Sequence, residues 1–252
     1  MNIKHSIAPF LLLLTVLVMW EVSAYVVGKS YLFPGPVAII EKMIALHATL
    51  FYEHLPATLS IVGLGLLLSM ILGVSVAVLM HQFKPIEKAL YPLLVVSQTI
   101  PIIALAPIFV LWFGYSIWSK VVVTVLITFF PITVNTFDGL RSTPKELREL
   151  FLTMKASRFA MFMKLYVPSA LPSFLSGMKV AIPLSVVGAA IGEWLGAQAG
   201  LGYFSRRMMT QFDGPGVFAP IVWLSFIGIV GFLLVKGLEN YLLRWRNEHE
   251  RK

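Results

Sequence analysis

The chain has 252 residues, of which 58% are hydrophobic and only 13% are charged. A soluble domain has about 45–50% apolar and about 25% charged residues, so this composition excludes an ordinary soluble domain. The net charge of +8 does not indicate nucleic-acid binding, because the basic residues fall between apolar runs, as membrane orientation requires. The absence of cysteine excludes a disulfide framework and thiolate chemistry.

The apolar runs predict six membrane crossings, because a helix needs about 20 apolar residues to span a bilayer. The first run contains one charged residue, Glu21, and is expected to be a retained span rather than a cleaved leader. A turn at residues 32–36 precedes an expected amphipathic surface helix at 37–50. The expected spans are residues 8–27, 59–80, 90–113, 118–134, 174–195 and 217–243.

The third span contains Pro101 and Pro107, which a membrane helix tolerates with kinks. Pro101 frees the carbonyl of Ser97, and Gln98 and Thr99 lie beside it. Freed carbonyls and polar side chains at membrane depth form the binding sites of transporters. We therefore assign Gln98, Thr99 and Pro101 to a translocation path. The alternative is a kink satisfied internally, with the Ser97 hydroxyl bonded to nearby backbone.

The basic residues predict the orientation of the spans. Most of the 20 Lys and Arg residues lie on the side that holds both termini, the loop at 81–88 and the polar segment 135–172. Cytoplasmic loops of membrane proteins carry an excess of Lys and Arg, so both termini and this segment are expected in the cytoplasm. The opposite side holds Lys29, Lys42, Arg206 and Arg207, with Lys120 at a boundary.

The polar segment is expected to contain two amphipathic helical pieces that meet near residues 155–157. The second piece places Phe159, Phe162 and Met163 on one face, at i, i+3 and i+4. An apolar face on a cytoplasmic helix must pack on something. One interpretation is that it packs on this protein's own helix ends, and the other is that it inserts into a groove on a partner.

This segment resembles the cytoplasmic loop of binding-protein-dependent ABC importer permeases. In that family Glu-Ala-Ala is followed after three residues by Gly, and after nine more by Ile-x-Leu-Pro. Here Glu149 takes the acidic position, Lys155 stands at the glycine position, and residues 165–168 read Leu-Tyr-Val-Pro. Leu150 and Phe151 replace the two alanines. Because Lys155 replaces a permissive glycine, a non-glycine residue must make the turn.

The resemblance implies an all-α membrane protein with the type I importer permease fold and a coupling helix between spans four and five. It implies a second copy of this permease, two ABC ATPase subunits and an extracytoplasmic substrate-binding protein, in the lipid bilayer of a bacterial inner membrane. ATP and Mg are then expected on the ATPase, with no cofactor on this chain. The residues expected to couple to the ATPase are Glu149, Lys155, Ala156, Ser157, Arg158, Phe159, Phe162, Leu165 and Pro168.

The fifth span carries glycines every four residues, which predicts close helix packing, either within the chain or beside the translocation path at a dimer axis. Glu193 and Trp194 lie in the same stretch, and we assign both to the path because intramembrane ionisable residues are functional candidates. The alternative for Glu193 is a carboxylate that reaches the outer interface. Lys179 is expected to snorkel, and Lys236 to pair with Glu239. The glycines are Gly188, Gly192, Gly196 and Gly200.

The sequence has no Gly-x4-Gly-Lys-[Ser/Thr] phosphate loop and no serine-hydrolase or zinc-protease motif, so we expect no enzyme. The five histidines have no metal-ligand spacing, so we expect no metal site.

Residues 192–203 resemble the sulfonate, taurine, nitrate and thiamine-precursor branch of the family. Residues 212–213 and 217–219 resemble permeases for thiamine pyrimidine precursors. A sulfonate, taurine or nitrate is the alternative cargo. A secondary carrier or an intramembrane enzyme is the alternative class.

Overall fold

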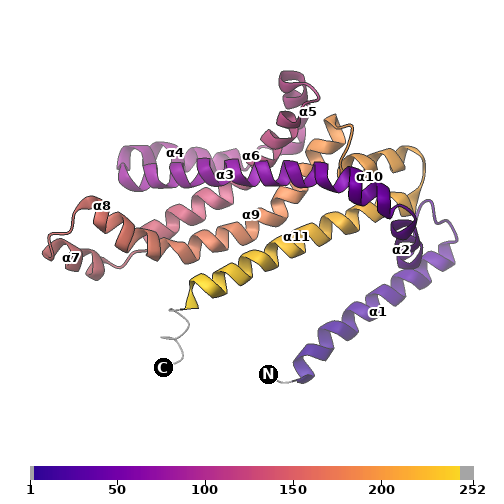
Figure 1. Cartoon of the computed structure of the whole chain (residues 1–252), viewed down its shortest axis with the longest axis horizontal. Helices are drawn as coiled ribbons and strands as arrows, with labels where there is room; N and C mark the ends of the chain where they lie inside the picture. Colours follow the sequence, from indigo (N-terminus) through magenta and orange to yellow (C-terminus); the bar gives the residue numbers. More distant parts are fainter. Residues whose placement is uncertain (1–2, 245–252) are drawn as a thin grey trace. The chain divides into compact units, whose positions relative to one another are not determined.

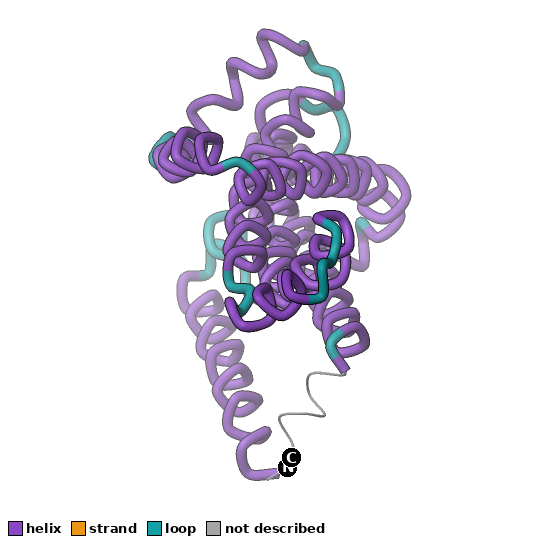
Figure 2. The backbone as a smooth tube through the Cα atoms, turned by 90° about the vertical axis from the view of Figure 1, so that its left-hand side faces the viewer, coloured by secondary structure: helices purple, strands orange, loops and turns teal. Residues whose placement is uncertain are grey.

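A computed structural model describes residues 3–244, which form helices joined by short connections with no strand in that range (Figure 1). Figure 2 shows the same helices as a tube interrupted by brief loops. The all-α fold expected from the sequence is confirmed; the polar tail after Arg244 lies outside the described residues. The elements are α1 (Ile3–Val27), α2 (Pro36–Ala45), the π-helical η1 (Thr49–His54), α3 (Leu55–Gln82), α4 (Lys84–Ser97), α5 (Ile102–Phe113), α6 (Ile117–Arg141), α7 (Lys145–Thr153), α8 (Arg158–Met161), the π-helical η2 (Phe162–Tyr166), α9 (Val167–Gly196), α10 (Leu201–Thr210) and α11 (Gly214–Leu242).

The chain divides into two compact units. The first unit comprises Met1–Thr58 and Gln198–Leu224, and the second comprises Leu59–Ala197 and Ser225–Lys252. The second unit therefore holds α4 to α9 and most of α3 and α11.

Helix α6 is central to the second unit because small residues bring two helices close to it. On α9, an added Cβ would lie 2.8 Å from the Pro131 carbonyl oxygen at Gly177 and 2.9 Å from the Thr124 Cα at Gly188. On α3, Gly65 has no room for a Cβ beside the Thr124 side chain. Small residues at such spacings let membrane helices approach closely. Helices α6 and α9 are accordingly the most closely packed pair in the second unit, and they run side by side in Figure 1.

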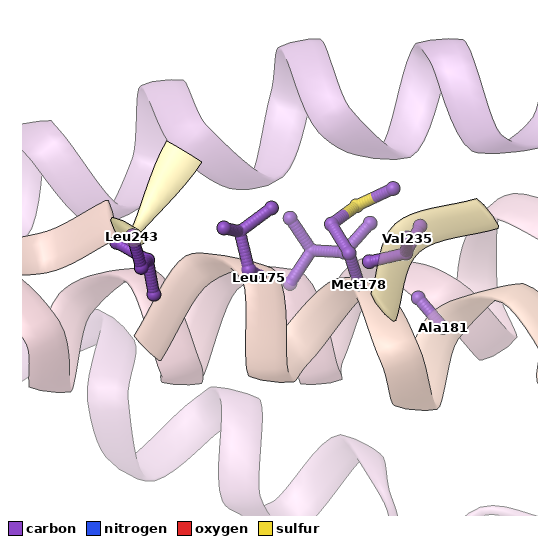
Figure 3. Close-up of a cluster of buried hydrophobic side chains, with 6 residues drawn as sticks. Leu175, Met178, Ala181, Val235 and Leu243 are labelled. Atoms are coloured by element: carbon purple, nitrogen blue, oxygen red, sulfur yellow. The ribbon is translucent and has the colours of Figure 1, made fainter. Parts of the chain in front are cut away.

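A buried apolar cluster joins α9 to α11 in the second unit (Figure 3). Leu175, Met178 and Ala181 of α9 lie beside Val235 of α11 and Leu243 just after it. In lipid these contacts stabilise through close packing rather than through removal of apolar surface from water. The cluster fixes the last helix to the α6–α9 pair.

Five helices in the described residues are long and apolar enough to cross a membrane, and α4 with α5 makes a sixth candidate if the bent pair is one span. The sequence predicted a single kinked span at 90–113. Instead α4 and α5 are separate helices that meet at about 100° across residues 98–101. The physical reason is Pro101, which disfavours helical geometry at the preceding residue and donates no backbone hydrogen bond.

Three stretches outside the expected spans are helical. α6 continues through Asn135 to Arg141, because its polar side chains bond its own backbone; Asn135 Nδ2 donates to the Pro131 carbonyl at 2.8 Å. α9 begins at Val167, with Pro168 in its first turn, where a missing N–H costs little. The stretch between the fifth and sixth expected spans contains α10.

In the first unit, α2 is held at both ends. Glu21 of α1 accepts a hydrogen bond from the Val37 backbone N–H at 3.0 Å, close to the start of α2. Near its end, Lys42 pairs with Asp213 at 2.6 Å. The carboxylate at the helix N-terminus complements the helix dipole. The expected amphipathic helix is therefore present, although it ends at Ala45 rather than at residue 50.

Candidate functional site

The candidate coupling segment consists of α7, a turn, α8 and η2, and it lies beyond the ends of α6 and α9 in Figure 1. At the end of α7 the Ala156 N–H donates to the Phe151 carbonyl and the Lys155 N–H to the Leu152 carbonyl, each at 3.0 Å. This pair of bonds is a Schellman motif, whose αL position normally holds glycine. Lys155 occupies that position with φ of +53°. A non-glycine residue thus makes the turn at the family's glycine position.

Ser157 starts the second piece of the segment. Its hydroxyl accepts a hydrogen bond from the Ala160 N–H at 3.2 Å, which is the usual N-cap contact. The cap fixes the direction in which α8 leaves the turn. Met161 and Leu165 then face inward and are buried, whereas Phe159 and Met163 face outward and are exposed. The expected apolar face is therefore partly turned away from this protein's own helices.

A second apolar face lies on α7, the first of the two amphipathic pieces expected from the sequence. Leu147, Leu150, Phe151 and Met154 recur at i, i+3, i+4 and i+7, which places them on one side of the helix. No residue of α7 is buried; Leu150 is 53% and Met154 70% exposed.

The segment's other predicted residues divide by exposure. Ala156 and Phe162 are half-buried, and Leu165 is buried. The exposed predicted residues are Glu149, Lys155, Ser157, Arg158, Phe159 and Pro168. Basic Lys155 lies in the turn and basic Arg158 follows it. The exposed apolar side chains of the segment therefore have positive charges beside them.

Gln98, Thr99 and Pro101 lie in the connection between α4 and α5, and all three are exposed. The Thr99 hydroxyl donates to the Val96 carbonyl at 2.8 Å, and the Ser97 hydroxyl donates to the Leu94 carbonyl at 2.7 Å. The Ser97 and Thr99 hydroxyls therefore bond backbone carbonyls three residues earlier, as the alternative of a locally satisfied kink predicted. The three residues lie together in this connection, whereas Glu193 lies on α9.

Glu193 is 0% exposed, so it does not reach an interface as the alternative required. It follows Gly192, whose added Cβ would lie 2.9 Å from the Cα of Lys120 on α6. Lys120 is only 4% exposed, so a basic side chain is buried against the residue that precedes Glu193. Trp194, by contrast, is exposed. A buried opposite charge near Glu193 was missed because Lys120 stands at the predicted start of a span.

Three of the four predicted stripe glycines lie on α9 and contact the same unit. An added Cβ would meet Thr124 at Gly188, Lys120 at Gly192, and the Val110 side chain at 2.8 Å at Gly196. Gly200 is not on that helix, because α9 ends at Gly196 and Gly200 has φ of +123°. The four-residue spacing of the glycines in the sequence therefore extends beyond the helix that carries the first three.

The expected charge partners on the last helix were wrong. Lys179 Nζ donates to both carboxylate oxygens of Glu239, at 2.9 Å and 2.7 Å. Lys236 is exposed instead. Lys179 thus joins α9 to α11 rather than snorkelling.

His54 is a buried polar residue that sequence reasoning placed in a loop without a role. Its Nδ1 accepts from the Gly200 N–H at 3.1 Å, and Thr58 Oγ1 accepts from the Leu201 N–H at 2.9 Å. Together they cap the start of α10 within the first unit. Because Nδ1 accepts, the neutral ring carries its proton on Nε2, which has no hydrogen-bond partner in the described structure.

No group of three or more potential metal ligands occurs among the described residues.

The amino-acid sequence of the chain matches a family of known proteins. Residues 65–245 match the family described as "Binding-protein-dependent transport system inner membrane component". The chain is 61% identical to the formylaminopyrimidine transport permease of Halalkalibacterium halodurans, over 97% of this chain and 98% of that one. It is 34% identical to a riboflavin transport system permease of Chloroflexus aurantiacus, over 92% and 88% of the two chains. It is 26% identical to the taurine transport system permease of Escherichia coli, over 98% and 91%.

Proposed function

Because the chain belongs to the family of binding-protein-dependent transport system inner membrane components, it is the permease subunit of an ABC importer, and we propose that its cargo is a formylaminopyrimidine, a pyrimidine precursor of thiamine. The observation that carries the cargo is the 61% identity to a formylaminopyrimidine permease over nearly the whole of both chains. The chain works as a transport subunit and not as an enzyme.

Coupling to a separate ATPase subunit is the second part of the proposal. The exposed apolar face of α7 and the outward Phe159 support it, because such a surface on a polar segment fits a groove on a protein partner. The Schellman turn at Lys155 and the Ser157 cap hold the two pieces in one arrangement. A fixed arrangement lowers the entropy lost on docking.

In the transport cycle, two copies of the permease and two ATPase subunits form the complex. ATP binding closes the ATPase pair, the segment 149–165 moves with it, and the spans switch from inward-open to outward-open. An extracytoplasmic binding protein then delivers the cargo. Each ligand shifts the equilibrium only by its differential affinity for the two states.

The orientation follows from the basic residues. The start of α4, with Lys84 and Lys88, and the α7–α8 segment carry Lys and Arg at high density, so this side and both termini face the cytoplasm. The turn between α5 and α6 then faces outward, because α6 runs from that turn to the segment.

Uptake competition tests the cargo. Cells that express the permease with its ATPase and binding protein take up labelled formylaminopyrimidine, and we expect excess unlabelled formylaminopyrimidine to abolish the signal while excess taurine leaves it unchanged. In the same cells, uptake of labelled taurine that excess taurine abolishes and excess formylaminopyrimidine leaves unchanged would assign the chain to sulfonates, the alternative that the 26% identity to the taurine permease supports.

A further inference from the structure

The turn between α5 and α6 is fixed by a buried lysine. Lys120 Nζ donates to the carbonyl oxygens of Tyr115 and Ser116, each at 2.8 Å. The Ser116 hydroxyl donates to the Phe113 carbonyl at 2.8 Å, and the Ser119 hydroxyl to the Ser116 carbonyl at 2.9 Å. Side chains therefore hold nearly every carbonyl of this short turn.

The end of α9 closes on the same turn. Gly192 lets the α9 backbone approach Lys120 so closely that an added Cβ would lie 2.9 Å from its Cα. At Gly196 an added Cβ would lie 3.6 Å from the Tyr115 ring. Glu193, between these glycines, is fully buried, and so is Lys120. An acidic and a basic side chain are therefore both buried where α6, α9 and the turn converge.

Stability alone does not account for this arrangement. Burial of ionisable groups in a membrane-spanning unit is costly, and such groups are functional candidates. Replacing a buried charge pair with apolar residues is often neutral or stabilising, whereas removing one partner is strongly destabilising. The turn also presents Trp112, Tyr115 and Trp118, which are all exposed, from a backbone that these bonds hold in one conformation.

We propose that Lys120 and Glu193 are positioning residues for transport, which hold the α5–α6 turn against the end of α9. The inference rests on the importer function proposed above and deepens it. The coupling segment joins α6 to α9 at their other ends. Movement applied there reaches the far ends of both helices together only if the turn is fixed to both, because packed elements shift as rigid bodies.

Neutralising the charges one at a time and together tests this role. In the complex with its ATPase and binding protein, Lys120→Met and Glu193→Gln should each lower the permease recovered from membranes by roughly threefold or more, because each leaves a buried charge uncompensated. The double variant should restore recovery to within about twofold of wild type. It should retain ATP hydrolysis but lose transport, with uptake per permease roughly tenfold or more below wild type. Lys236→Met, which neutralises an exposed lysine, is the matched control and should change none of these.

A label on the turn provides a readout that does not depend on uptake. The chain has no native cysteine, so Tyr115→Cys accepts a single spin label. We expect an immobilised spectrum in the otherwise wild-type complex and a mobile spectrum in the Lys120→Met/Glu193→Gln background. Wild-type uptake and an immobile label in the double variant would overturn the proposal and leave the charges a structural role only. If the wild-type complex itself catalyses no ATP-driven uptake, the importer function fails, and label mobility still decides whether the charges hold the turn.

Discussion

The apolar face of α7 leads to the sharpest prediction, because its side chains are exposed in the permease and are expected to be covered only by the ATPase. Fully burying a Leu or Met side chain contributes about 1.5–3 kcal/mol. Leu150 has 53% and Met154 70% of its surface left to bury. The two together should therefore contribute about 1.8–3.7 kcal/mol to docking. Leu150→Ser/Met154→Ser should weaken association with the ATPase roughly 20- to 500-fold.

The assay is co-purification, with the ratio of ATPase to permease as the measured quantity. Leu152→Ser is the matched control, because Leu152 is 54% exposed on the opposite side of the same helix. Neither variant should change the amount of permease in the membrane, since no residue of α7 is buried. An equal ATPase ratio in the double variant and in Leu152→Ser would refute the assignment of this face to docking.

Three further predictions concern local structure. Lys155→Gly should remove a backbone strain of about 1 kcal/mol from the left-handed conformation and raise the thermal midpoint of the purified permease by about 2–4 °C. Lys155→Ala should leave the midpoint unchanged. An equal rise in both variants would contradict the αL assignment. Gly192→Leu must displace the α6 backbone and should lower the permease level in membranes severalfold, while Gly63→Leu, which meets nothing within 4 Å, should be tolerated; equal levels would show that the α6–α9 approach is not tight. His54→Leu leaves the buried Gly200 N–H without its acceptor and should lower the free energy of thermal unfolding by about 1–3 kcal/mol. His54→Asn should recover part of this loss, because its amide oxygen can accept the hydrogen bond. Identical losses of stability in the two variants would argue against a hydrogen-bond role.

Composition and periodicity were sufficient to predict the membrane class, because an apolar run of span length has few alternatives. The positions of α3, α6, α9 and α11 follow from those runs to within a few residues at most ends. The family was predictable because the spacing from Glu149 to Pro168 survives the loss of its glycine, and the structure explains that loss through the αL conformation of Lys155.

Helix ends in polar sequence were less predictable. Asn135 and Thr136 suggested a loop, yet both side chains bond carbonyls four residues earlier on α6. Such polar residues stay helical when their side chains find partners on the same helix. The bend at 98–101 is larger than the kink that the sequence predicted. The effect of Pro101 depends on whether tertiary packing straightens the helix, which one sequence does not show.

Partners across the fold could not be deduced from one sequence. Glu239 lies three residues from Lys236, which favours local pairing, but Lys179 is its partner from 60 residues away. Lys120 near Glu193 and His54 under Gly200 are likewise contacts between distant segments. The pattern Gly65-x-x-x-Ser69-x-x-x-Gly73 on α3 was readable as a packing stripe and was missed.

The central claim, that this permease couples ATP hydrolysis on a partner to inward transport through its α7–α8 segment, is tested most directly by reconstitution. Proteoliposomes would contain the permease and its ATPase, with binding protein and labelled formylaminopyrimidine on one side and ATP supplied to either side. The account predicts accumulation only when ATP is on the side of the α7–α8 segment, and no accumulation with Leu150→Ser/Met154→Ser. Accumulation without ATP, or undiminished accumulation by that variant, would contradict it.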